Sequence, residues 1–444
     1  MPFSPFDNLP PLTKEDALEI LNTSIEDLTL SSDYYKAVFH LEKYPSIETQ
    51  KALINLIKST ESHISVSIAK RKAIEVLARL GCKELIPITI KFLASQDKYL
   101  VESSVLALKE LGCTDIKVHK YIGTLLEDQS LNLRPLIQSL SKMHAISQIS
   151  RIRNILHDKT MPPSIKGAAI AAISNLTGSI EYINELKEYL ISSNQNERQL
   201  AVQDIIDANA ISLLPEVIRT PISSSLRFRA IEILFAESSN IHQRGYIFKL
   251  IETVLIDDPS NLKISYQSNS VPDIKECIRN LFSTDFNQAY SALNNLKEKS
   301  FLEVWNLLSE SLHLFEKDYG GLYFLVLFLR DNKILDSQIK NKIASIFLSC
   351  LSEKWPKYMK FRPVSIIGLI KLDQQAYIHH ITDWLDQDKE IYWVVRYAAL
   401  FVIKDVKLIA ENTILLKAIR SCLGDSHLFV RWKANAILES TNLN

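Results

Sequence analysis

The stretches that decide the fold lie in the first quarter of the chain. Residues 70–81 read Lys-Arg-Lys-Ala-Ile-Glu-Val-Leu-Ala-Arg-Leu-Gly, and residues 99–108 read Tyr-Leu-Val-Glu-Ser-Ser-Val-Leu-Ala-Leu. In both, apolar residues recur at the i, i+3, i+4 and i+7 spacing of a helix that buries one face. Each also has a small residue near its middle, which lets neighbouring helices approach closely.

Small residues at equivalent places recur along the chain. They are separated by 29 to 36 residues in the first half and by 34 and 35 in the second. The positions are Ala37, Ala73, Ser104, Leu136 (the one large member), Ala169, Ala201, Ala230, Ser365, Ala399 and Ala434. A second apolar helix precedes such segments. A period of this length predicts stacked helix pairs, because one pair cannot bury its apolar face alone.

The helix-pair pattern resembles that of HEAT repeats. The resemblance implies an all-α, right-handed α-solenoid, in which the second helix of each pair lines a concave surface for a ligand or partner. We expect residues 1–12 to form an N-terminal tail. Thr13, with a carboxylate three residues further on, is a good N-cap for the first helix.

The repeat period breaks between Ala230 and Ala289, and the polar segment 257–275 lies in the gap. We interpret this segment as an exposed loop or a hinge. It would divide the chain into an N-terminal half-array, residues 13–256, and a C-terminal half-array, residues 276–444.

Composition excludes several classes of protein. The 444 residues include 51 Lys and Arg and 51 Asp and Glu, so the chain lacks the basic excess of a non-specific nucleic-acid binder. No apolar run approaches the roughly 20 residues that span a bilayer, and the first residues do not read as a signal peptide. The five cysteines lie far apart and indicate reduced, mostly buried thiols. We expect a soluble cytoplasmic protein without a metal.

The sequence contains no nucleophile elbow, P-loop, zincin helix or dinucleotide-binding motif. His379 and His380 are adjacent and would point about 100° apart on a helix, so we interpret them as surface or interface residues. An active site, if there is one, must therefore be assembled on the concave face.

Arginine recurs near the start of the second helix of the repeats. The positions are Arg71, Arg134, Arg229, Arg396 and Arg431. In HEAT arrays an aspartate in the turn of a repeat pairs with this arginine. Asp128 and Asp425 each lie six residues before an arginine of this set, so we interpret Arg134 and Arg431 as structural.

Glu102 occupies the same place with the opposite charge, and Asp97 lies five residues earlier. A ladder of Asp–Arg pairs gives no reason for an acid there. Glu102 is therefore the best candidate for a general acid or for a hydrogen-bond acceptor to a cationic ligand. An ordinary solvated glutamate is the alternative.

Aromatic residues gather at the same helix starts. Tyr99 is one of them, and Trp393 and Trp432, each close to an arginine of this set, are candidates to cover a flat ligand. Arginines between such plates would suit a planar, apolar molecule with carboxylate side chains. They would equally suit a protein partner, and aromatic residues that enter helices are often core.

A combination of segments carries a family resemblance. The segments are 12–17, 31–37, 71–80 and 97–102, with further likeness at 396–399 and 430–434. Together they resemble the HEAT-repeat (E/F-type) phycobilin lyases of cyanobacteria. The long single chain is most similar to the branch that attaches phycoerythrobilin to the alpha subunit of phycoerythrin. The Tyr-His-Cys motif of some isomerising relatives is absent, which gives no support to isomerase activity.

The resemblance implies the chemistry. A cysteine thiolate of a phycobiliprotein subunit adds to the ethylidene group of bilin ring A and forms a thioether. The enzyme holds the tetrapyrrole, binds its propionates and supplies a proton. On this interpretation Glu102 and Asp97 are the acid, Arg71, Arg229 and Arg396 bind propionates or the partner, and the three aromatic residues cover the rings.

The resemblance also implies the partners. They are the bilin, as substrate rather than cofactor, the phycobiliprotein subunit and a possible smaller HEAT-repeat helper subunit, with no nucleic acid or membrane. Two other functions remain open from the sequence: a non-catalytic chaperone or adaptor for phycobiliprotein subunits, and an unrelated HEAT scaffold. Mixing the protein with bilin and apo-subunit would separate the three.

Overall fold

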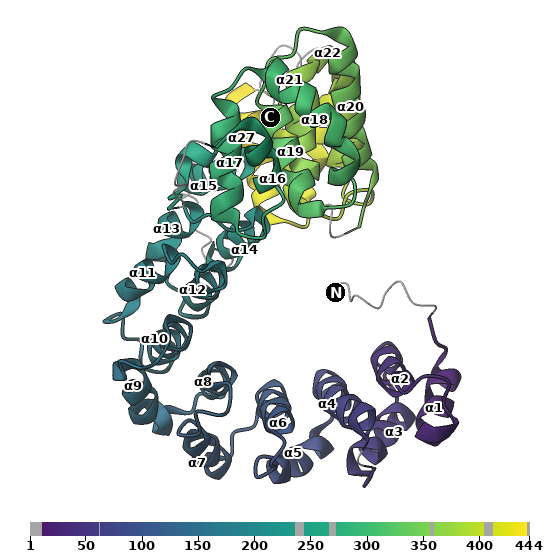
Figure 1. Cartoon of the computed structure of the whole chain (residues 1–444), viewed down its shortest axis with the longest axis vertical. Coiled ribbons are helices and arrows are strands. Elements are labelled where there is room, and N and C mark those ends of the chain that lie inside the picture. Colours follow the sequence, from purple (N-terminus) through teal and green to yellow (C-terminus); the bar gives the residue numbers. More distant parts are fainter. Residues whose placement is uncertain are drawn as a thin grey trace. The chain divides into compact units, whose positions relative to one another are not determined.

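The computed structural model describes residues 11–61, 63–235, 244–265, 272–355, 359–403 and 412–441 (Figure 1). These residues form helices joined by turns, and among them there is no strand. The prediction of an all-α protein built from helical repeats is confirmed. The chain divides into two compact units. Unit 1 is residues 1–186 with 207–209, and unit 2 is residues 187–206 with 210–444.

Unit 1 is a stack of helix pairs in two layers. Its helices are α1 (Lys14–Asn22), α2 (Asp33–Leu41), α3 (Ile47–Lys58), α4 (Ile64–Arg79), α5 (Ile86–Phe92), α6 (Lys98–Glu110), α7 (Ile116–Leu125), α8 (Leu133–Lys142), α9 (Ile149–His157) and α10 (Pro163–Thr177). The even-numbered helices pack on one another in order and form the inner layer, on the concave side of the unit (Figure 1). The odd-numbered helices form the outer layer.

Unit 2 continues the helix pairs. Its helices are α11 (Leu186–Leu190, which begins at the last residue of unit 1), α12 (Gln195–Asp207), α13 (Leu214–Ile218), α14 (Ser224–Phe235), α15 (Arg244–Ile256), α16 (Ile274–Asn280), α17 (Phe286–Lys297), α18 (Phe301–Phe315), α19 (Tyr319–Arg330), α20 (Ser337–Ser352), α21 (Arg362–Leu372), α22 (Gln374–Tyr377), α23 (Ile381–Leu385), α24 (Trp393–Phe401), α26 (Thr413–Ser421) and α27 (Leu428–Thr441). Helices α17, α19, α21, α24 and α27 pack on one another in sequence order. The hinge predicted at 257–275 lies inside this unit.

The small residues that set the repeat are all in contact positions. Every member of the series from Ala37 to Ala434 is at most 1% exposed. A side chain of this size lets adjacent inner helices approach, which explains why the period could be read from these positions. Thr13 also behaves as predicted, because it forms a capping box with Asp16 at the start of α1.

A ladder of ion pairs joins successive repeats. An arginine near the start of an inner helix binds an acid in the turn of the next repeat, 26 to 30 residues further along the chain. The pairs are Arg71–Asp97, Arg227–Asp257, Arg362–Glu390 and Arg396–Asp425. Each pair crosses from one repeat to the next and therefore favours their stacking.

The predicted pairing of Asp425 with Arg431 within one repeat is wrong. Asp425 binds Arg396 of the preceding repeat, and Arg431 instead donates to the main-chain oxygens of Asp425 and Ser426, at 2.5 and 3.0 Å. Arg134 reaches forward along the chain, as Arg396 does. It donates to the main-chain oxygen of Ser164, 30 residues further on. An arginine is long enough to span two stacked repeats, so its partner need not lie in its own turn. Both arginines remain structural.

The segment predicted as an exposed loop begins in the core of unit 2. Asp257 is 1% exposed, and its carboxylate accepts hydrogen bonds from Arg227 at 2.6 Å, Tyr290 at 2.6 Å and Tyr323 at 2.5 Å. A buried carboxylate is tolerated when it is paired and hydrogen-bonded in this way. The expectation of exposure is therefore wrong at this end of the segment. Residues 266–271 lie outside the described residues.

The last repeats of unit 2 contact helices α14 and α15. Lys433 of α27 binds Glu252 of α15 at 2.7 Å, and Nε2 of His427 lies 3.4 Å from a carboxylate oxygen of Glu232 in α14. These contacts cover part of the inner face of α24 and α27. That face is where the sequence placed several of the candidate site residues.

Candidate functional site

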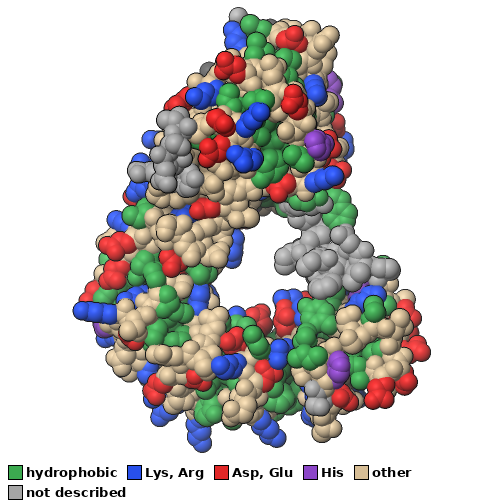
Figure 2. All heavy atoms as spheres, in the orientation of Figure 1, with side chains coloured by type: hydrophobic (Ala, Val, Ile, Leu, Met, Phe, Trp, Pro, Cys, Tyr) green, Lys and Arg blue, Asp and Glu red, His purple; other side chains and the backbone are tan. Residues whose placement is uncertain are grey.

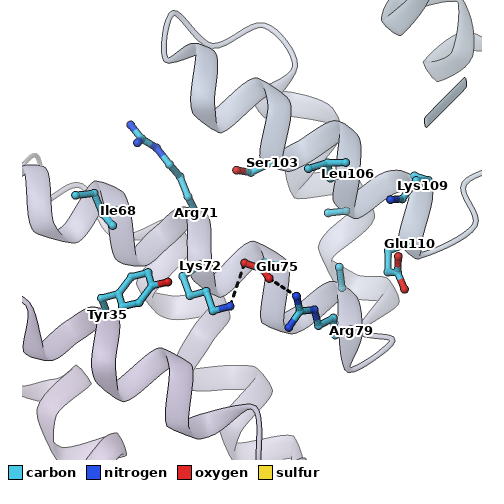
Figure 3. A pocket seen from close by; sticks show the side chains of 12 residues that line it. Tyr35, Ile68, Arg71, Lys72, Glu75, Arg79, Ser103, Leu106, Lys109 and Glu110 are labelled. Carbon is cyan, nitrogen blue, oxygen red and sulfur yellow. Dashed lines mark hydrogen bonds and ion pairs between the residues drawn. The ribbon is translucent and has the colours of Figure 1, made fainter. Parts of the chain in front are cut away.

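A pocket of about 420 Å³ opens between the inner helices α2, α4 and α6 of unit 1 (Figure 3). Its lining consists of Tyr35, Ile68, Arg71, Lys72, Glu75, Ala78, Arg79, Ser103, Leu106, Ala107, Lys109 and Glu110. The volume lies within the range of about 300–1,000 Å³ that is common for small-molecule sites.

The helix period explains why these side chains face the pocket. On α4 the lining runs from Ile68 through Arg71, Lys72 and Glu75 to Arg79, at spacings of three and four residues. Residues so spaced lie on one face of a helix, and the intervening residues of α4 form the core. The polar face of the amphipathic helix α4 thus lines the pocket, and α2 and α6 form its walls.

Cations outnumber carboxylates in the lining. Arg71, Lys72, Arg79 and Lys109 stand against Glu75 and Glu110. Glu75 binds Lys72, 3.1 Å away, and also Arg79, whose other partner is Glu42 at 2.9 Å. Arg71 and Arg79 also have carboxylate partners outside the lining, Asp97 and Glu42, so the lining supplies guanidinium and ammonium donors for a ligand carboxylate rather than a net positive charge.

Apolar side chains complete the pocket. Ile68 and Leu106 are exposed although they are large and apolar, and Ala78 and Ala107 also line the pocket. Exposed apolar surface beside a cluster of cations suits a molecule with a hydrophobic body and acidic substituents. The pocket therefore has the character that the sequence predicted for a concave site, although largely from other residues.

Three of the predicted site residues meet beside this pocket. Nη2 of Arg71 lies 2.7 Å from Asp97, and the guanidinium carbon lies 4.8 Å from the centre of the exposed Tyr99 ring. The other carboxylate oxygen of Asp97 accepts from the main-chain N–H groups of Tyr99 and Leu100 and caps α6. Both oxygens of Asp97 are in use, which favours a structural role for it. Arg71 and Tyr99 remain placed to contact a ligand.

Glu102 belongs to the ladder rather than to the pocket lining. Its Oε1 accepts from the main-chain N–H of Asn132 at 3.0 Å, in the turn of the next repeat. In this turn the group that binds the inner helix is a main-chain N–H donor, whereas in the ladder pairs of other repeats it is a carboxylate. An acid at position 102 can therefore make the contact that an arginine makes in those repeats. The premise that the ladder gives no reason for an acid here is wrong. The structure favours the structural role of Glu102 over the catalytic one.

The two remaining candidate arginines lie in unit 2. Arg396 is 2% exposed and binds both carboxylate oxygens of Asp425, at 2.6 and 2.7 Å. It is a buried structural residue in this conformation. Arg229 is exposed on α14 and donates to Gln203 at 3.0 Å, while Arg227 is the residue that takes the ladder position in its repeat.

The two candidate tryptophans are core residues. Trp393 is 6% exposed, and its ring stacks on His427 with 4.3 Å between ring centres. Trp432 is 7% exposed and lies beneath Arg244. The predicted use of Trp393 and Trp432 as covering plates is not supported, because the contacts within unit 2 bury them. The alternative that aromatic residues at helix starts are core is the one that the structure favours.

Sequence reasoning missed most of the pocket lining. Tyr35, Lys72, Glu75, Arg79 and Lys109 were not among the candidates. A signal was present, since residues 68–79 place charged side chains on one helix face next to an exposed isoleucine. The predicted candidates lie near the first turns of inner helices, whereas the pocket lies along the length of α4 and α6.

The described residues hold neither a metal-binding cluster of side chains nor a membrane-spanning helix. No cluster of three or more His, Cys, Asp or Glu side chains that could hold a metal occurs there. Among the helices that the structure describes, none has the length and apolar character needed to cross a bilayer. The visible face in Figure 2 intersperses acidic and basic side chains, as the formal net charge of zero suggests.

Fold and pocket define a class: a helical-repeat protein whose inner layer carries a partly apolar small-molecule pocket with guanidinium and ammonium groups. The bilin biosynthesis protein CpeY of Synechococcus sp. (strain WH8020) is 34% identical over 392 residues, covering 87% of this chain and 91% of the relative. The chain belongs to the family of this bilin biosynthesis protein. The family resemblance stated from the sequence is thereby confirmed.

Two further comparisons gave matches. The uncharacterized phycocyanin operon protein Y of Pseudanabaena tenuis (strain PCC 7409) is 27% identical over 397 residues, covering 88% of this chain and 92% of the relative. A solved structure of the complex of CpcE and CpcF of phycocyanin lyase from Nostoc sp. PCC7120 is 22% identical, with a TM-score of 0.48, and covers 57% of this chain and 99% of the matched chain. No family model matches.

Proposed function

We propose that this protein is a bilin lyase that attaches phycoerythrobilin through a thioether to a cysteine of a phycobiliprotein subunit, with a phycoerythrin subunit as the acceptor. The observation that carries the proposal is the pocket between α2, α4 and α6, with its guanidinium and ammonium groups beside exposed apolar side chains. A bilin has a flat apolar body and two propionates. Membership in the family of a bilin biosynthesis protein supports the same substrate.

The cysteines of this chain support an acceptor that brings its own nucleophile. All five are buried and free of disulfides. Burial raises the pKa of the Cys350 and Cys422 thiols to about 12, and it also raises the pKa of Cys82 and Cys277. A thiolate is the reactive form of cysteine. The thioether sulfur would therefore come from the phycobiliprotein subunit, and the enzyme would hold and orient the bilin.

Different residues of the pocket would bind different parts of the bilin. Arg71 and Lys109 stand on facing helices and would bind the propionates, because guanidinium and ammonium groups form charge-assisted hydrogen bonds with carboxylates. Ile68 and Leu106 would contact the pyrrole rings, and the exposed Tyr99 would cover the bilin at the rim. No cofactor is needed, since the bilin itself is the substrate.

Reconstitution tests the proposal. The pure protein is mixed with phycoerythrobilin and an apo-phycoerythrin subunit, and pigment that survives denaturing electrophoresis is measured. The proposal predicts a covalent product that depends on the acceptor cysteine. Bilin binding without transfer would favour the chaperone or adaptor function, and the absence of bilin binding would leave a helical-repeat scaffold. A run with a smaller helical-repeat helper subunit added separates a chain that needs one from an inactive chain.

A further inference from the structure

Thioether formation needs a proton donor in the bilin pocket. When sulfur adds to the CH carbon of the ring A ethylidene group, the π electron pair of that double bond moves onto the ring. The reaction is complete only when a ring atom is protonated. The net change is addition of S–H across C=C, so nothing is oxidised or reduced, and the donor must be a group that touches the bilin.

The carboxyl groups and the serine hydroxyl of the pocket are poorly suited to donate this proton. Glu75 is engaged by Lys72 and Arg79 and so acts as an acceptor. Glu110 is exposed, whereas carboxyl groups that act as general acids are typically shielded from water. The hydroxyl of Ser103 already donates to the main-chain oxygen of Tyr99 at 2.8 Å.

Tyr35 brings a phenol hydroxyl to the pocket lining. It is half-buried on α2, and its ring points from that helix toward the lining residues of α4 (Figure 3). Burial, together with the negative charge of Glu75, raises the pKa of the Tyr35 hydroxyl above its ordinary value. The phenol therefore keeps its proton at neutral pH and releases it only to a strongly basic centre. A carbanion on the bilin ring is such a centre.

We propose that Tyr35 is the proton donor of the reaction, an inference that rests on the proposed lyase function. The sulfur of the acceptor cysteine, which has given up its proton, forms the C–S bond. The displaced π pair takes the proton of the Tyr35 hydroxyl and forms a C–H bond on ring A. The tyrosinate then recovers a proton from solvent, which had received the one lost by the thiol. Atoms and charge balance with no further reactant.

The test is the variant Tyr35→Phe, which removes the hydroxyl and keeps the ring. Bilin affinity is measured by absorbance titration, and the single-turnover rate of transfer is measured at saturating bilin. The proposal predicts an affinity within about threefold of wild type and transfer slower by at least about tenfold, as for loss of a general acid. The matched control is Tyr121→Phe, which alters an exposed tyrosine of α7 outside the pocket lining. It should change neither quantity.

The outcomes distinguish failure of the inference about Tyr35 from failure of the proposed lyase function. If the wild type forms no covalent product, the lyase function fails. If the wild type transfers bilin and Tyr35→Phe does so within about twofold of its rate, the proton comes from elsewhere and the inference is overturned. Circular dichroism checks folding. Should Tyr35→Phe not fold, Tyr35→Gln, which retains polarity but has no acidic proton, must show the same loss.

Discussion

The buried pair of Arg396 and Asp425 gives the sharpest prediction about stability. Two of the guanidinium nitrogens bind the carboxylate at 2.6 and 2.7 Å, and the residues are 2% and 3% exposed. The variant Asp425→Asn keeps the shape but leaves a buried guanidinium without its counter-charge. Removal of one partner from a buried ion pair costs about 3–5 kcal/mol. For a unit of this size that corresponds to a melting temperature lower by roughly 6–20 °C.

Tryptophan fluorescence follows this unit alone. All five tryptophans of the chain lie in unit 2, whereas far-ultraviolet circular dichroism reports helices of both units. Urea unfolding of Asp425→Asn should show an earlier fluorescence transition. The control is Asp383→Asn, the same change in an exposed ion pair with Lys389, where the expected effect is below about 1 kcal/mol. Equal midpoints for the two variants would refute the structural role of the buried pair.

Three other predictions follow from the site and the ladder. Glu102→Gln keeps an oxygen to accept from Asn132 and should leave transfer within about twofold of wild type; a loss of at least about tenfold with unchanged bilin binding would restore Glu102 as the acid. Arg134→Ala should lower the free energy of unfolding by about 1–3 kcal/mol, seen by circular dichroism, with transfer per folded molecule unchanged. Because burial raises the pKa of Cys350 and Cys422 to about 12, a thiol reagent at pH 8 should label them at least about a hundred times faster in urea than in buffer; fast native labelling would contradict their burial.

The repeat architecture was predictable because it depends on residues that lie close together in the sequence. A small residue every 29 to 36 positions marks where inner helices touch, and all these positions are buried as expected. The capping box of Thr13 and Asp16 needs only neighbouring residues, and it too was readable. The class of fold therefore follows from periodicity and helix-end chemistry.

The ladder and the site depend on contacts between repeats, which the sequence shows less directly. Spacing alone could not tell whether Asp425 pairs with the arginine six residues later or with the one 29 residues earlier. Burial of Trp393 follows from contacts between the last repeats and α14, helices far apart in the sequence. A residue at the start of an inner helix is on the concave face only where no other part of the chain covers it.

The measurement that tests the account most directly is covalent transfer by pocket variants of the whole protein. Phycoerythrobilin and an apo-phycoerythrin subunit are incubated with wild type and with Leu106→Glu, which places a carboxylate in the apolar part of the lining. The account predicts a pigmented, denaturation-resistant subunit with the wild type, and at least about tenfold weaker bilin binding and little product with the folded variant. Equal product from both would show that the bilin is held elsewhere, and no product from the wild type would contradict the lyase function.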